Sequence, residues 1–130
     1  TIIITNQSGL SSGKITQVQY EAVNAELIRQ LDGLIDVVYF CPDTPANPTH
    51  RRKPGTGMLE EASCEHGIDL TRSWMVGDKD IDIFCGRKAG CRTILVETGY
   101  GKKHLSAGAD FIARDVTSAI AIIQEFPQSP

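Results

Sequence analysis

Apolar and polar positions follow one another along the chain in blocks that are typical of a parallel α/β protein. Short β-branched or apolar runs predict strands, and longer stretches with an apolar residue every three or four positions predict helices between them. The predicted strands are residues 1–5, 36–40, 73–76, 93–96 and 110–113, and the predicted helices are residues 16–31, 58–66, 80–90 and a last one capped by Asp115. This alternation predicts a three-layer α/β sandwich with a mostly parallel sheet and right-handed crossovers.

The helix predicted at residues 16–31 carries the longest apolar stripe. We expect Thr16 to cap its start, Gly33 to close it, and the stripe to pack against the sheet. The stripe consists of Val18, Ala22, Ala25, Leu27, Ile28 and Leu31. The first strand, T-I-I-I-T, is β-branched throughout, which suits a strand covered on both faces.

Polar residues follow directly where two of these strands end. Thr5 leads into Asn6, Ser8 and Gly9, a turn whose amides can form an anion-binding nest, although a purely structural turn explains the same residues. Asp78 follows the apolar run 74–76, and open α/β sheets bind ligands at the carboxyl ends of their strands. We therefore expect chemistry at this edge.

A loop with four prolines, residues 41–54, ends in the basic triplet Arg51-Arg52-Lys53 just before a helix. Three adjacent cations repel one another unless an anion lies nearby, and a helix N-terminus also favours anions. The triplet therefore indicates a small anionic ligand more than plain surface charge.

The composition is that of an ordinary protein of one domain, 130 residues long with 41% hydrophobic residues. A net charge of -3 and an aromatic content of 6% argue against nucleic acid as a partner, and no apolar stretch reaches the roughly 20 residues that span a bilayer. We expect a cytoplasmic protein with no membrane partner, whose four scattered cysteines are free thiols.

Phosphoryl transfer needs cations near the transferred oxygens and a metal that offsets their charge. Thr5 with its following amides, Lys53 and the carboxylates of Asp78 and Asp82 supply such parts in this order. Magnesium binds one or two carboxylates together with water and phosphate oxygens, so Asp78 suits it.

These motifs resemble the haloacid dehalogenase superfamily of aspartate-nucleophile phosphatases, and most closely its small-capped branch, which acts on heptose bisphosphate and histidinol phosphate. The similar segments are residues 4–9, 13–14, 39–42, 52–54 with 57–59, and 75–79 with Asp82. The resemblance covers nearly the whole chain, and it implies a Rossmann-like core without a large cap domain.

By this resemblance, Thr5, Lys53 and Asp78 would be catalytic: Thr5 would hydrogen-bond the phosphoryl group, Lys53 would neutralise an aspartyl-phosphate, and Asp78 would ligate magnesium. Asp82 would support the metal or Lys53, unless it only interacts with the helix dipole. The substrate-binding residues would be Asn6, Ser8, Gly9, Arg52 and Lys79.

The chain departs from the family's pattern at its start. The family's nucleophile and acid/base aspartates form a D-x-D pair on a strand before the first one seen here, and no such pair precedes Thr1. A sheet without this central strand would leave backbone groups unpaired, at about 1–3 kcal/mol for each buried one. We therefore expect the natural protein to carry a further N-terminal segment with that strand.

A second departure concerns zinc, which the branch commonly binds in the proline-rich loop. The corresponding positions here are Cys41, Asp43, Thr49 and Arg51, and an arginine cannot replace a thiolate ligand. His50 beside Cys41 and Asp43 offers only a poor alternative, so we expect magnesium but no zinc.

The sequence thus predicts a magnesium-dependent phosphatase of a small phosphorylated metabolite, such as heptose 1,7-bisphosphate or, alternatively, histidinol phosphate. A different class stays open: a phosphate-binding or interaction domain that has lost the nucleophile strand and does not catalyse. The sequence leaves the exact substrate and the oligomeric state open.

Overall fold

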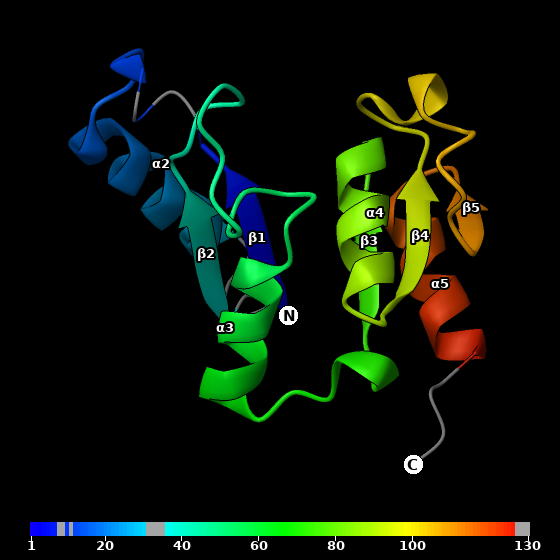
Figure 1. The fold of residues 1–130 in the computed structure, drawn as a ribbon. Helices are drawn as coiled ribbons and strands as arrows, with labels where there is room; N and C mark the ends of the chain where they lie inside the picture. The colour runs from blue at the N-terminus through cyan, green and yellow to red at the C-terminus, as the bar shows by residue number, and fades with distance from the viewer. Residues whose placement is uncertain (8–9, 11, 31–35, 127–130) are drawn as a thin grey trace. The chain divides into compact units, whose positions relative to one another are not determined.

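The computed structural model describes residues 1–7, 10, 12–30 and 36–126 (Figure 1). The chain forms two compact units, Thr1–Met58 and Leu59–Pro130, and each unit has its own parallel sheet. No helix among the described residues is long and apolar enough to cross a bilayer.

The first unit is built on a pair of parallel strands, β1 (Ile2–Asn6) and β2 (Val37–Cys41), with Ile2 opposite Val37 and Asn6 opposite Cys41. Helix α2 (Gln17–Gln30) connects them. It begins with a capping box, since the amide of Gln19 donates to Thr16 Oγ1 and the amide of Thr16 donates to Gln19 Oε1. The predicted cap at Thr16 is confirmed.

The predicted packing stripe of α2 is wrong at the positions that the structure describes. Val18 is 74% exposed, and Ala22 and Ala25 are exposed as well. Tyr20, 5% exposed, makes the contact instead, with its ring centroid 4.7 Å from that of Phe40 on β2. The large ring of Tyr20 therefore covers β2, while Val18, Ala22 and Ala25 face outwards. The side chains of Leu27 and Ile28, and all of Leu31 and Gly33, lie outside the described residues.

Strand β1 is also less covered than its β-branched sequence suggests. All five of its residues are half-buried rather than buried, so the prediction of burial on both faces is wrong. Among the described residues β1 pairs with β2 alone, which leaves one of its edges without a strand partner.

The second unit holds a three-stranded parallel sheet in the order β3-β4-β5, formed by β3 (Trp74–Gly77), β4 (Arg92–Val96) and β5 (Phe111–Ala113). Most of α3 (Gly57–His66) also belongs to it. The other elements are η1 (Leu70–Arg72), α4 (Asp80–Lys88), η2 (Gly101–Lys103) and α5 (Val116–Glu125).

Helices α4 and α5 cover opposite faces of this sheet (Figure 1). A Cβ at Gly86 of α4 would lie 2.5 Å from Cβ of Met75 on β3, so α4 packs on the face to which Met75 points. Ala119 of α5 packs with Ile94 and Val96 of β4. These two residues are two positions apart, so both point to the other face of the sheet. The second unit therefore has the predicted three layers.

The predicted strands and helices are confirmed, with ends that shift by a residue or two. Asp115 caps α5 by accepting a hydrogen bond of 2.8 Å from the amide of Ser118. All four cysteines are free, as expected; Cys41, Cys85 and Cys91 are buried and Cys64 is exposed.

Thr93 and Asp110 join β4 to the start of β5. Asp110 Oδ2 accepts hydrogen bonds from the amide of Thr93 (2.8 Å) and from its hydroxyl (3.1 Å), and the amide of Asp110 donates to Thr93 Oγ1 (3.1 Å). Thr93 is fully buried, so its hydroxyl acts where water does not compete.

We predict that Thr93→Val, which keeps the shape but removes the hydroxyl, lowers the free energy of unfolding by about 1–3 kcal/mol. Denaturant titration measures this change. Thr117→Val, at an exposed position of α5, is the matched control and should change stability by less than about 0.5 kcal/mol. Equal effects of the two substitutions would show that the Thr93 hydroxyl contributes nothing specific.

Candidate functional site

The predicted site residues fall into two groups, one in each unit. Thr5, Asn6, Arg52 and Lys53 belong to the first unit, and Asp78, Lys79 and Asp82 belong to the second. Ser8 and Gly9 lie outside the described residues, so their predicted contacts with substrate stay predictions.

Thr5 lies near the carboxyl end of β1. Its hydroxyl accepts a hydrogen bond of 3.0 Å from Gln7 Nε2, and its side chain helps to line a hollow of about 280 Å³ beside α2. The lining of this hollow is mostly apolar, with Ile3 and Tyr20 among its residues. The hydroxyl of Thr5 is thus held at the strand end by its own turn.

Asn6 and Lys53 bring the end of β1 together with the basic triplet, 47 positions further along the chain. The amide of Lys53 donates to Asn6 Oδ1 (3.1 Å), and Asn6 Nδ2 donates to the carbonyl of Lys53 (3.4 Å). The ammonium group of Lys53 donates to the carbonyl of Ile4 on β1 (3.3 Å). Two of the residues that the sequence assigned to one anion site, Asn6 and Lys53, therefore touch.

The guanidinium group of Arg52 binds the proline-rich loop and not β1. Its Nη1 donates to the carbonyl of Asp43 over 2.8 Å, and Asp43 Oδ2 accepts the amide of Thr49 over 2.7 Å. The hydrogen bonds from Thr49 hold the pKa of Asp43 below its ordinary value. The loop is thereby closed by its own side chains and backbone.

The expectation that Cys41, Asp43, Thr49 and Arg51, which correspond to the family's zinc ligands, bind no zinc stays a prediction. Burial raises the pKa of the Cys41 thiol above its ordinary value. His50 Nε2 lies 3.3 Å from the hydroxyl of Thr56. In the described part of the chain, no three His, Cys, Asp or Glu side chains are grouped as metal ligands.

The second group lies in the turn between β3 and α4. Asp82 is 6% exposed, and its Oδ2 accepts the amides of Asp78 and Lys79, each over 3.2 Å. A Cβ at Gly77 would lie 2.4 Å from Cβ of Asp82, so only glycine fits there. This geometry agrees with the alternative interpretation of Asp82 as a carboxylate that stabilises the helix start, while its predicted metal role stays a prediction.

Asp78 is half-buried and is connected to the loop that follows β4. Its Oδ2 accepts the amide of Tyr100 over 3.1 Å. A Cβ at Gly99 would lie 2.3 Å from the same oxygen, and Gly99 has a φ of +64°, so this close approach also requires glycine. Asp78 Oδ1 accepts no hydrogen bond from the described residues.

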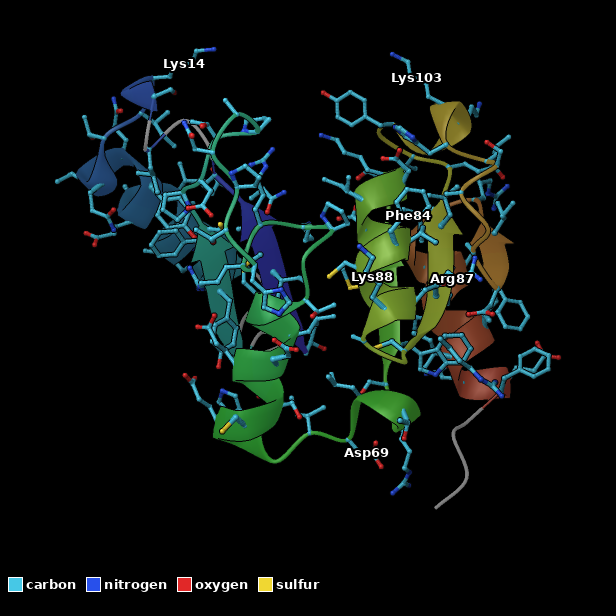
Figure 2. All side chains as sticks on the ribbon, in the orientation of Figure 1. Lys14, Asp69, Phe84, Arg87, Lys88 and Lys103 are labelled. Atoms are coloured by element: carbon cyan, nitrogen blue, oxygen red, sulfur yellow. The ribbon has the colours of Figure 1, made fainter. Side chains whose placement is uncertain are left out.

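The loop after β4 contributes Tyr100 and Lys103, and the ring of Tyr100 lies near the cations of two different segments. The ammonium group of Lys79 lies 4.6 Å from the ring centroid of Tyr100, and that of Lys103 lies 5.9 Å from it. Figure 2 shows the side chain of Lys103 pointing away from the sheet. His104 Nδ1 lies 3.7 Å from Asp80 Oδ1. Tyr100 thus connects Asp78, through its amide, with the ammonium groups of Lys79 and Lys103, through its ring.

Three features of these groups were missed in the sequence. Gln7 holds the Thr5 hydroxyl, Asp43 closes the loop before Arg52, and the Gly99-Tyr100 backbone contacts Asp78. Gly99 alone carried a usable signal, because a glycine after a strand often allows a close backbone approach.

Comparison with known proteins defines the class to which this fold and these groups belong. The model of the HAD-hydrolase-like family matches residues 50–119, just over half of the chain. The chain belongs to the haloacid dehalogenase (HAD) superfamily and groups with its phosphatases.

Two relatives extend the similarity to most of the chain. The D-glycero-D-manno-heptose-1,7-bisphosphate 7-phosphatase of Thermosynechococcus vestitus is 38% identical over 91% of this chain and 70% of its own length. The enzyme of the same name from Chlorobaculum tepidum is 35% identical over 92% of this chain and 69% of its own length.

Solved structures agree with this assignment. The D,D-heptose 1,7-bisphosphate phosphatase of B. bronchiseptica, complexed with magnesium and phosphate, matches with a TM-score of 0.87 and 31% identity over 96% of this chain and 74% of the other. The corresponding enzyme of Burkholderia thailandensis matches with a TM-score of 0.71 and 26% identity over 96% and 75%. The α/β HAD fold predicted from the sequence is confirmed.

We predict that the loop before Arg52 loosens at acidic pH. Because the folded pKa of Asp43 is lowered, its hydrogen bond from Thr49 stabilises the loop above the ordinary aspartate pKa of about 3.9. This stabilisation is lost as the pH falls through the lower, folded value. Hydrogen exchange of the Thr49 amide, followed against pH, measures it.

Asp43→Asn keeps a carbonyl oxygen but loses the charge. In this variant, exchange of the Thr49 amide should not show the acid-dependent step that protonation of Asp43 causes in the wild type. Glu125→Gln on α5 removes a charge elsewhere and should leave the step unchanged. A step that persists in Asp43→Asn would assign it to another group.

Proposed function

We propose that this protein is a magnesium-dependent phosphatase of a small sugar bisphosphate, such as D-glycero-D-manno-heptose 1,7-bisphosphate. The observation that carries the proposal is the match to the B. bronchiseptica enzyme, which extends over 96% of the chain and whose structure contains magnesium and phosphate. The names of the T. vestitus and C. tepidum relatives support the same substrate.

In the first unit, Thr5 and Lys53 are the groups that would bind the transferred phosphoryl group. The Thr5 hydroxyl would donate its one proton to a phosphoryl oxygen in place of its long, 3.5 Å hydrogen bond to the carbonyl of Asn6, and it can still accept the hydrogen bond from Gln7. The ammonium group of Lys53 supplies a full positive charge, which lowers the energy of a transition state with charge on its oxygens. Arg52 adds a second cation next to it in sequence.

In the second unit, the residues present fit magnesium. Asp78 offers a carboxylate at the end of β3, one oxygen of which is fixed by the amide of Tyr100 while the other accepts no hydrogen bond from the described residues. A hard oxygen ligand held in this way is what magnesium selects. When bound, magnesium would offset the negative charge of the phosphoryl oxygens.

Lys79 and Asp82 have supporting roles in this proposal. Lys79 presents an ammonium group beside Asp78, where it would contact a phosphate of the substrate. Asp82 holds the amides of Asp78 and Lys79 and thereby orients the turn that carries both. None of these residues is the nucleophile; the family resemblance assigns that role, and the aspartyl-phosphate it forms, to a D-x-D pair.

The test is phosphate release from heptose 1,7-bisphosphate, heptose 7-phosphate and histidinol phosphate, with and without magnesium. We predict release from the heptose bisphosphate that requires magnesium. Asp78→Asn should lower the rate about a hundredfold or more, the scale on which the loss of one group that stabilises the transition state acts.

Asp80→Asn is the matched control. It removes the same charge from a residue two positions away, and that residue has no role in the proposal. It should keep the wild-type rate within a few-fold. Absence of turnover on every phosphomonoester would contradict the proposal. Phosphate binding without turnover would instead favour a phosphate-binding domain that does not catalyse.

A further inference from the structure

The side chain of Asn6 is paired with the backbone of Lys53 as one peptide group pairs with another. Its oxygen accepts the amide of Lys53 over 3.1 Å, and its nitrogen donates to the carbonyl of Lys53 over 3.4 Å. Only one orientation of the Asn6 amide satisfies both bonds, because an N–H must face a carbonyl and an oxygen must face an N–H. The pairing therefore determines how Lys53 sits against the end of β1.

The side chain of Lys53 is anchored to the same strand. Its ammonium group donates to the carbonyl of Ile4 over 3.3 Å, two residues before Asn6. The backbone of Lys53 is thus held by one residue of β1 and its charge by another. A loop residue with two attachments of this kind loses little conformational entropy when it meets a ligand.

We propose that Asn6 is a positioning residue, which sets the place of the Lys53 ammonium group, rather than a group that binds substrate itself. Its amide retains one N–H and one lone pair, but the two bonds to Lys53 direct it at the loop. The role of the Lys53 ammonium group in phosphate binding rests on the proposed function. The pairing of Asn6 with the backbone of Lys53 does not.

Substitutions of Asn6 separate the two bonds. Asn6→Ala removes both, so the backbone of Lys53 loses its partners and the ammonium group gains freedom. Asn6→Asp retains an acceptor for the Lys53 amide but has no donor for the carbonyl, so it should rescue in part. Asn47→Ala makes the same change at an exposed position of the adjoining loop and is the matched control.

The first experiment measures the acylation rate of Lys53 by limiting acetic anhydride, with the exposed Lys14 of the same molecule as reference (Figure 2). In Asn6→Ala, the rate of Lys53 relative to Lys14 should rise roughly three- to tenfold, the range that the loss of one net hydrogen bond supports. Asn6→Asp should give an intermediate rate, and Asn47→Ala the wild-type rate. An unchanged rate in both Asn6 variants overturns the proposal.

Hydrogen exchange is the control that distinguishes a local effect on Lys53 from a general loss of structure. Exchange at the Lys53 amide should become faster in Asn6→Ala, while the Gly55 amide, which donates to the carbonyl of Arg52 over 2.7 Å, should keep its rate. If both amides become faster by the same factor, Asn6 stabilises the loop as a whole and the positioning role is wrong. Should Asn6→Ala fail to fold, Asn6→Asp is compared with wild type in the same way.

The second experiment is a double-mutant cycle on the binding of orthophosphate. If Asn6 acts through Lys53, Asn6→Ala and Lys53→Ala each weaken binding, and the double variant binds as weakly as Lys53→Ala alone. Effects that multiply would make Asn6 a direct ligand and overturn the proposal. If wild type binds no phosphate, the proposed function fails, and the acylation rates still decide the role of Asn6.

Discussion

A single buried carboxylate organises the edge of the sheet in the second unit. Asp82 accepts the amides of Asp78 and Lys79 with one oxygen, and hydrogen bonds to a charged group contribute about 1.5–3 kcal/mol each. The bond closes the turn from β3 into α4 and leaves the Asp78 side chain facing the loop after β4. Without Asp82, the amides of Asp78 and Lys79 would lose their partner, and only the hydrogen bond from the Tyr100 amide would hold Asp78.

This arrangement explains why some of the site could be predicted from sequence. An apolar run that stops at Gly77-Asp78 marks a strand end, and Asp78 does follow directly after β3, which ends at Gly77. Asp82 was expected to support the metal shell or the helix start, and its carboxylate accepts the backbone amide of Asp78. Sequence could not choose between a metal ligand and a helix cap for Asp82, because both need a carboxylate in the first turn.

Other features depend on contacts between distant residues and could not be predicted. The apolar period of α2 was correct as a helix signal but chose the wrong face, because Tyr20 packs on Phe40 and no local pattern encodes that partner. The resemblance assigns Asn6 to substrate, and no local pattern showed that its amide also pairs with a backbone 47 positions away. The proline-rich loop showed no periodicity at all, yet Asp43 and Thr49 give it a defined closure.

The contact between Asp78 and the loop after β4 has an evolutionary consequence. Asp78 accepts a hydrogen bond from the main chain of residue 100, whereas the Tyr100 side chain is 51% exposed, with the ammonium groups of Lys79 and Lys103 near its ring. Position 99 favours glycine because of its φ of +64°, but position 100 contributes an amide that nearly every residue has. Selection can therefore exchange the side chain at position 100, and with it what the loop offers to a substrate, without disturbing the geometry of the carboxylate.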